Sequence, residues 1–248
     1  MFLIAWSGFF GAFCAHALNW GFDLMNDYSL SNVDQISINN SKANLSHKLT
    51  PRGSLRHGST QLDGPRKIII DGNYAYIMSH YGNSLEIVDV SNPNNPTHIS
   101  SLTQSPAVSL YTPMGMIKHG NYIYLASSTN YLVIVDVSNP NNPIFVRQIA
   151  RTTTIKLGAP RGMDIVWNRL YITSYNDDAL EIMDISTPSN PTHLGSYQSA
   201  THLDGATDIK IIGNYAYVTA FLAKKLTVID ITNPLTPLYV SPIATTSR

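Results

Sequence analysis

Charge is scarce in this chain. Asp, Glu, Lys and Arg together make up 13% of its 248 residues, and 16 basic residues balance 16 acidic ones. The sequence contains no basic run, so it lacks the electrostatic footprint of a protein that binds nucleic acid or an anionic membrane surface. We therefore expect no nucleic-acid partner.

Cysteine is scarcer still, because Cys14 is the only one and no disulfide can form within the chain. It lies in an apolar stretch, residues 1–17, that has the length of a signal peptide's apolar region and ends in the small-x-small pattern Ala15-His16-Ala17. No Lys or Arg precedes the stretch, and it is too short for a comfortable transmembrane span. We interpret it as a candidate signal peptide of a secreted or cell-surface protein, and expect no integral membrane span. The alternatives are an apolar strand of a poorly matching first blade or the cut edge of a longer protein. A cytoplasmic location is the alternative to export.

Known catalytic motifs are also lacking. The sequence has no Gly-x-Ser-x-Gly, no His-Glu-x-x-His, no phosphate-binding loop and no dinucleotide fingerprint. The eight histidines show no local metal-ligand spacing. We therefore expect no catalytic residue, metal or cofactor. The alternative is a hydrolase that gathers a metal site from distant parts of the chain: His80, His202, Asp177 and Asp208.

The chain contains one sequence motif in four versions. They read "LEIVDVSNPNNP" at 85–96, "LVIVDVSNPNNP" at 132–143, "LEIMDISTPSNP" at 180–191 and "LTVIDITNPLTP" at 226–237. Their leading leucines are 47, 48 and 46 residues apart. Such regular spacing indicates a structural repeat.

Each repeat predicts four short strands. A short apolar segment, beginning at 67, 116, 163 or 208, is followed by a two-residue turn, usually Gly-Asn, and a tyrosine-rich segment. A variable loop leads to the "LVIVD" run, whose consecutive apolar residues predict a strand buried on both faces. An Asn-Pro-x-x-Pro turn and a fourth extended segment complete the unit. Four such sheets with two apolar faces must pack against one another, which predicts an all-β propeller of four-stranded blades.

An aspartate ends each predicted third strand, just before the turn. We interpret these four residues as acceptors for backbone N–H groups of the turn, as in Asx-turns, rather than as metal ligands. They are Asp89, Asp136, Asp184 and Asp230.

These segments, from "GNYAYI" at 72–77 to "LTVIDITNP" at 226–234, resemble the LVIVD repeat family. The resemblance covers about residues 62–248 and implies a β-propeller, of a kind common in exported and surface-attached microbial proteins. It also implies a non-enzymatic binding module. The sequence lacks the Gly-His and Trp-Asp pairs of WD repeats and the Gly-Gly doublet of kelch repeats.

Four clear blades leave residues 18–61 to be explained. Residues 55–70 parallel 197–212, so 55–61 is predicted to be the outer strand of a preceding blade. We expect residues 18–61 to form a degenerate fifth blade, which would close the ring and give a monomer. The alternatives are a linker before a four-bladed ring, or a fragment of a larger propeller.

Binding is expected on two sets of loops at the mouth of the propeller channel: those that precede first strands and those that join second to third strands. Exposed aromatic side chains there would suit a protein or glycan partner; an intracellular scaffold is the further alternative. The candidate binding residues are Arg66, His80, Tyr81, Asn130, Arg161, Tyr175, Asp177, Asp178, Asp208, Phe221 and Lys224.

Overall fold

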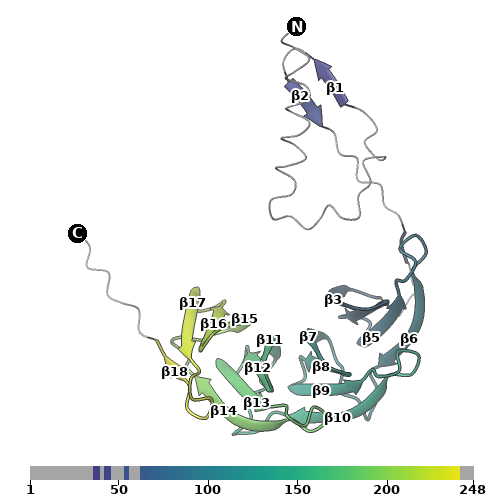
Figure 1. The fold of residues 1–248 in the computed structure, drawn as a ribbon. Coiled ribbons are helices and arrows are strands. Elements are labelled where there is room, and N and C mark those ends of the chain that lie inside the picture. Colours follow the sequence, from purple (N-terminus) through teal and green to yellow (C-terminus); the bar gives the residue numbers. More distant parts are fainter. Residues whose placement is uncertain (1–35, 40–41, 46–52, 56–61, 241–248) are drawn as a thin grey trace. The chain divides into compact units, whose positions relative to one another are not determined.

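The computed structural model describes residues 36–39, 42–45, 53–55 and 62–240. Every regular element in these ranges is a β-strand (Figure 1). Residues 1–51 and 52–248 are two separate compact units. In the first unit, β1 (Ile36–Asn39) and β2 (Lys42–Leu45) pair as an antiparallel hairpin. Within the described ranges no helix has the length and apolar character needed to cross a bilayer.

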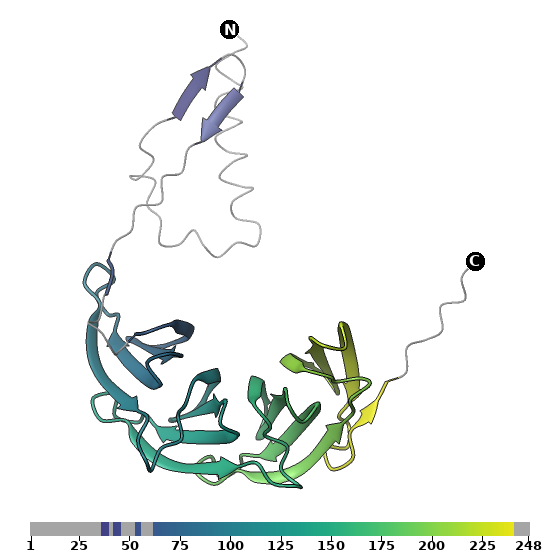
Figure 2. The same ribbon diagram turned by 180° about the vertical axis from the view of Figure 1, so that it is seen from behind.

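The second unit contains four antiparallel sheets of four strands, each made from consecutive strands of one repeat, as the repeat predicts. Sheets that follow each other in sequence are also neighbours in space (Figures 1 and 2). Blade 1 comprises β3 (Pro65–Asp71), β4 (Tyr74–Ser79), β5 (Ser84–Asp89) and β6 (Thr97–Thr103); blade 2 comprises β7 (Pro113–His119), β8 (Tyr122–Ser127), β9 (Tyr131–Asp136) and β10 (Ile144–Ala150). Blade 3 comprises β11 (Pro160–Val166), β12 (Arg169–Ser174), β13 (Ala179–Asp184) and β14 (Thr192–Gln198); blade 4 comprises β15 (Ala206–Ile212), β16 (Tyr215–Ala220), β17 (Lys225–Asp230) and β18 (Leu238–Tyr239).

The first strands begin two or three residues earlier than the apolar segments indicate. In each blade the pairing of the first and second strands shifts register close to the first strand's start, between Pro65 and Lys67 in blade 1 and between Pro113 and Gly115 in blade 2. A bulge interrupts the alternation of side chains between the two faces of a strand. The apolar pattern therefore reveals only the regular part that follows it.

The aspartates that end the third strands accept turn N–H groups, and this prediction is confirmed. Asp136 Oδ1 accepts a hydrogen bond from the Ser138 N–H at 2.8 Å. The equivalent hydrogen bonds to Asp89, Asp184 and Asp230 measure 2.7 or 2.8 Å. The donor in each case is the residue two positions further on, and these hydrogen bonds lower the pKa of the three aspartates.

Three apolar cores lie between neighbouring blades. Each contains the leading leucine of one blade's third strand and an apolar residue of the next blade's first strand. The three leucines are fully buried, and their counterparts are at most 6% exposed. The pairs are Leu85 with Met116, Leu132 with Met163, and Leu180 with Ile209.

The two end blades depart from this pattern. Leu226, the fourth leading leucine, is 65% exposed, and Ile68, the blade 1 equivalent of Met116, is 58% exposed. The expectation that every third strand is buried on both faces is therefore wrong for blade 4. The reason is that burial of a blade's face depends on a neighbouring sheet, and within residues 62–240 blades 1 and 4 each have a neighbouring blade on one face alone.

A short segment before blade 1 repeats a contact made between blades. A Cβ on Gly195 would lie 2.4 Å from the carbonyl oxygen of Pro234, in the turn after β17. A Cβ on Gly53 would lie 2.5 Å from the carbonyl oxygen of Pro93, in the equivalent turn after β5. Gly53 thus occupies the place that an outer strand of a preceding blade would hold. Residues 56–61 and most of 18–52 lie outside the described residues, so the degenerate fifth blade remains a prediction.

Candidate functional site

The two sets of loops singled out from the sequence lie together at one edge of the blades, which we call the rim. It consists of residues 62–66, 111–114, 158–161 and 204–207 before the first strands, and 80–83, 128–130, 175–178 and 221–224 between second and third strands. Backbone hydrogen bonds join the two sets within a blade. The His80 N–H donates to the Gly64 carbonyl at 2.9 Å, and the Phe221 N–H donates to the Gly205 carbonyl at 2.9 Å.

One rim position links each blade to the next. Asn83, Asn130 and Asp178 have φ values of 52°, 72° and 51°. Their Oδ1 atoms accept hydrogen bonds from the backbone of the following blade's rim, from the N–H groups of Thr112, Ala159 and Gly205 at 2.7, 2.9 and 3.0 Å. The fourth equivalent is Lys224, at φ 54°. An ammonium group has no acceptor atom, so blade 4 cannot make this bond.

Asp177 makes its hydrogen bonds within the fold. Its side chain is buried, and its carboxylate accepts hydrogen bonds from Arg151 Nε at 2.8 Å and from the Gly158 N–H at 2.7 Å. Burial raises the pKa of the Asp177 carboxyl, but the hydrogen bonds from Arg151 and Gly158 outweigh it and hold the pKa below its usual value. A Cβ on Gly158 would lie 2.7 Å from Asp177 Cγ, so the glycine is needed for this approach.

His80 is also held within the fold, whereas its neighbour is open to solvent. His80 Nδ1 lies 3.0 Å from the Pro113 carbonyl oxygen in the next blade. Its ring meets the Tyr81 ring edge-on, with centroids 4.8 Å apart. Tyr81 covers Gly64 and exposes most of its surface.

Arg161 and Tyr175 form a cation–π pair at the rim. The Arg161 guanidinium carbon lies 3.9 Å from the centroid of the Tyr175 ring, close enough for a favourable interaction with the ring face. Arg161 Nε is buried and has no hydrogen-bond partner among the described residues.

The remaining candidates are exposed and make few contacts. Arg66 approaches the sulfur of Met114 at 3.8 Å, and Asp208 Oδ1 accepts a hydrogen bond from the Ile209 N–H at 3.0 Å. Phe221 and Lys224 project from the loop between β16 and β17. The rim thus combines scaffold residues with open side chains of aromatic and charged character.

The residues of the alternative hydrolase site have other contacts. Asp177 pairs with Arg151, and His80 contacts Pro113. His202 Nδ1 lies 2.6 Å from the Tyr197 hydroxyl, and its ring stacks on Tyr239 with centroids 3.8 Å apart. Across residues 62–240 and the shorter described segments, no group of three or more His, Cys, Asp or Glu residues could hold a metal ion.

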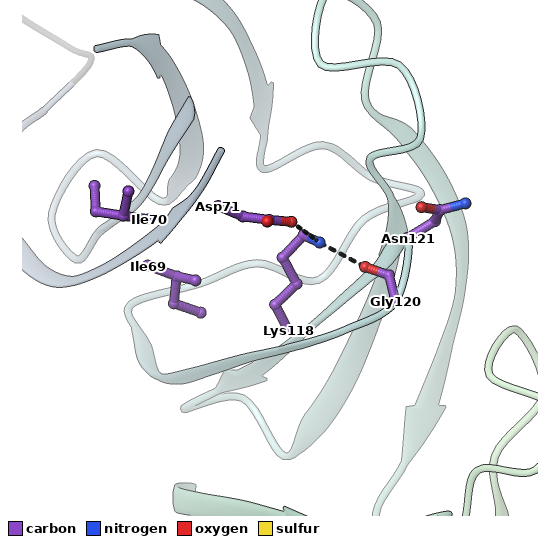
Figure 3. Close-up of a pocket in the computed structure, with 6 residues that line it drawn as sticks. All are labelled: Ile69, Ile70, Asp71, Lys118, Gly120 and Asn121. Atoms are coloured by element: carbon purple, nitrogen blue, oxygen red, sulfur yellow. Dashed lines mark hydrogen bonds and ion pairs between the residues drawn. The ribbon is translucent and has the colours of Figure 1, made fainter. Parts of the chain in front are cut away.

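A pocket of about 490 Å³ lies at the opposite edge, between the first hairpin turns of blades 1 and 2 (Figure 3). Lys118 Nζ donates to Asp71 Oδ2 at 2.5 Å and to the Gly120 carbonyl at 2.5 Å. The charges of this pocket therefore neutralise each other. Ile69 and Ile70 of β3 also line the pocket (Figure 3).

A second pocket at this edge, of about 550 Å³, was not singled out from the sequence. It contains Trp167, which stands where the other three repeats have the glycine of the Gly-Asn turn. This departure from the repeat is the sequence feature that could have indicated the pocket.

Solved structures share this arrangement of sheets at low sequence identity. A functionally unknown protein from Desulfotomaculum acetoxidans superposes with a TM-score of 0.57 at 14% identity, over 72% of this chain and 58% of that one. A protein from Lactobacillus plantarum gives 0.60 at 12% identity, over 71% and 56%. Hydrazine synthase from Kuenenia stuttgartiensis gives 0.54 at 18% identity, over 75% and 51%. This chain thus spans between half and three-fifths of these proteins, and the likeness concerns the fold alone.

A search of curated proteins finds no significant match. The sequence profile of the LVIVD repeat, however, matches residues 65–104, 117–150, 168–199 and 205–245, which together are more than half of the chain. Each match falls on one blade, although the third begins after β11 and so leaves out the first strand of blade 3. The chain therefore belongs to the LVIVD repeat family and folds as an all-β, propeller-like array of four blades.

Proposed function

We propose that this chain is a non-enzymatic binding module, exported or at the cell surface, whose rim contacts a protein or glycan partner. The observation that carries the proposal is the exposure of large aromatic side chains on rim loops: Tyr81 is 63% and Phe221 67% exposed. Aromatic residues of this kind are the usual anchors of binding interfaces, because they bury a large area at a low cost in conformational entropy.

The scaffold residues of the rim support this proposal. The side chains of Asn83, Asn130 and Asp178 and the buried Asp177 hold the loops in place through hydrogen bonds between blades. Loops positioned by a rigid repeated framework are a common location for recognition. Arg161, held against the ring of Tyr175, adds a positioned cation.

Export is supported by the sequence alone. The apolar stretch 1–17 and its Ala15-His16-Ala17 pattern lie outside the described residues. The LVIVD repeat family contributes the expectation of an exported or surface-attached protein.

The test uses protein secreted from a bacterial host, with its N-terminus read by mass spectrometry; export predicts Leu18 as the first residue. This protein is applied to an array of glycans and to a displayed peptide library. Replacement of Tyr81 and Phe221 by Ala should weaken the binding found at least tenfold, which is about 1.4 kcal/mol, with an unchanged melting temperature.

Tyr215→Ala is the matched control, since Tyr215 begins β16 at the opposite edge and Phe221 follows the end of the same strand. Equal losses in the Tyr215 variant and the rim variant would contradict the proposal. So would hydrolytic turnover with a stoichiometric transition metal.

A further inference from the structure

Blade 3 departs from the other repeats at its first hairpin turn. Residues 72–74, 120–122 and 213–215 all read Gly-Asn-Tyr, whereas residues 167–169 read Trp-Asn-Arg. In each of these two-residue turns only the first residue has a positive φ, as in a type II′ turn. The value is 54–58° for the three glycines and 53° for Trp167.

A tryptophan in this conformation is costly for the fold. Left-handed backbone conformations are strained for L-residues, because the Cβ comes too close to the following carbonyl oxygen. Burial does not offset this cost, because Trp167 is 76% exposed and little of its apolar area is removed from water. Backbone strain that burial does not offset is typical of residues with a functional role, such as recognition of a ligand.

A pocket lies beside Trp167. The turn borders the pocket of about 550 Å³, a volume within the range of ligand sites. Blade 3 supplies one side, and the turn after β17 of blade 4 supplies the other. Trp167, Arg169 and Asp184 line it from blade 3, and Pro234 and Leu235 line it from blade 4.

The chemistry of these residues indicates the class of ligand. The exposed indole offers a flat apolar face, on which the C–H face of a pyranose ring can stack. Half-buried Arg169 offers several N–H donors and Asp184 offers carboxylate acceptors. Neighbouring hydroxyls of a sugar both donate and accept, so they match a guanidinium and a carboxylate side by side. Asp184 Oδ1 already accepts the Ser186 N–H, whereas a sugar hydroxyl could donate to the other carboxylate oxygen. The negative charge of Asp184 disfavours an anionic ligand.

We propose that Trp167, Arg169 and Asp184 form a site for a neutral saccharide at the edge of blades 3 and 4 opposite the rim. The site is separate from the rim residues, and neither proposal depends on the other.

The repeat itself supplies the test variants. Trp167→Gly and Arg169→Tyr restore the residues found at the equivalent positions of the other three blades, so both should fold. Trp167→Gly also removes the backbone strain and should raise the melting temperature. A merely structural Trp167 would give the opposite result.

The probes are neutral oligosaccharides built from glucose, mannose, galactose, xylose or N-acetylglucosamine, titrated by calorimetry and by tryptophan fluorescence. A background lacking Trp6 and Trp20 leaves Trp167 as the only fluorophore of this kind. We expect at least one saccharide to bind and to change the fluorescence. Trp167→Gly should weaken its binding at least tenfold, Arg169→Tyr should weaken it as well, and the Tyr81 and Phe221 variant should bind as the parent does.

Several results would overturn the site: no binding by any saccharide of the panel, unchanged affinity in Trp167→Gly, or a lower melting temperature of that variant. Loss of saccharide binding in the rim variant alone would assign the sugar to the rim instead.

Discussion

Asp177 and Asp178 show how two adjacent residues of one type acquire different roles. Asp177 is buried and bonded to Arg151 and Gly158, which belong to the segment leading into blade 3. Asp178 turns through a positive φ and accepts the Gly205 N–H of blade 4. Both lie on the loop that the repeat predicts, and a direct role of either in binding remains a prediction. Their partners lie 19 to 27 residues away, and only the three-dimensional packing of the blades reveals these contacts.

At the residue scale, the lowered pKa of Asp177 makes an acid-dependent contribution to stability. The pKa is lower in the folded protein than in the unfolded chain, so the stabilisation is fully present above the unfolded value of about 3.9 and is lost as the pH falls through the folded value. We expect Asp177→Asn to cost about 2 kcal/mol at pH 7, in the range of hydrogen bonds to charged groups. The difference from the parent protein should shrink in acid, as measured by denaturant unfolding across pH.

The matched control is Asp178→Asn, because asparagine already fills the equivalent position in Asn83 and Asn130 and keeps the Oδ1 acceptor. This variant should be close to neutral. A difference for Asp177→Asn that stays constant from pH 7 down to about pH 3 would show that the carboxylate has no lowered pKa.

At the scale of elements, the repeat predicted the number, order and pairing of strands in all four blades. It succeeded because local signals agree: the turn glycines, the alternating tyrosine segments and the continuous apolar third strands each favour the same structure. The starts of the first strands were placed late, because a bulge near Pro65 and its equivalents breaks the alternation. The exposure of Leu226 was missed because its sequence is that of a buried strand, whereas its environment depends on a neighbouring blade.

The rim hydrogen bond between blades should contribute measurably to stability. Asn130→Lys installs the residue of blade 4, which tolerates the positive φ but cannot accept the Ala159 N–H. We expect a loss of about 1–2 kcal/mol in the free energy of unfolding, since the donor loses its partner. Asn130→Asp, which keeps an acceptor as Asp178 does, should lose far less. Equal losses in the two variants would mean that the bond between blades 2 and 3 is not stabilising.

At the scale of the whole molecule, blades 1 and 4 each have one face that no neighbouring blade of residues 62–240 covers. Three blade-to-blade cores bury their leucines completely, whereas Leu226 and Ile68 stay exposed on the two end blades. At about 25 cal/mol per Å² of apolar surface, leaving roughly several hundred Å² open on each face forgoes on the order of 10 kcal/mol. This amount is comparable with the stability of an entire domain. The contact of Gly53 with the Pro93 turn is one that an outer strand of a preceding blade would make.

The central claim is that each blade needs a neighbouring blade on both faces. Residues 18–61 are predicted to form the blade that lies between blades 4 and 1. Deletion of residues 18–54 together with residues 1–17, followed by thermal melting and light scattering, tests this claim most directly. We predict a lower melting temperature and association of the shortened chain, while removal of residues 1–17 alone changes neither. An unchanged melting temperature together with a clean monomer after the longer deletion would contradict the claim.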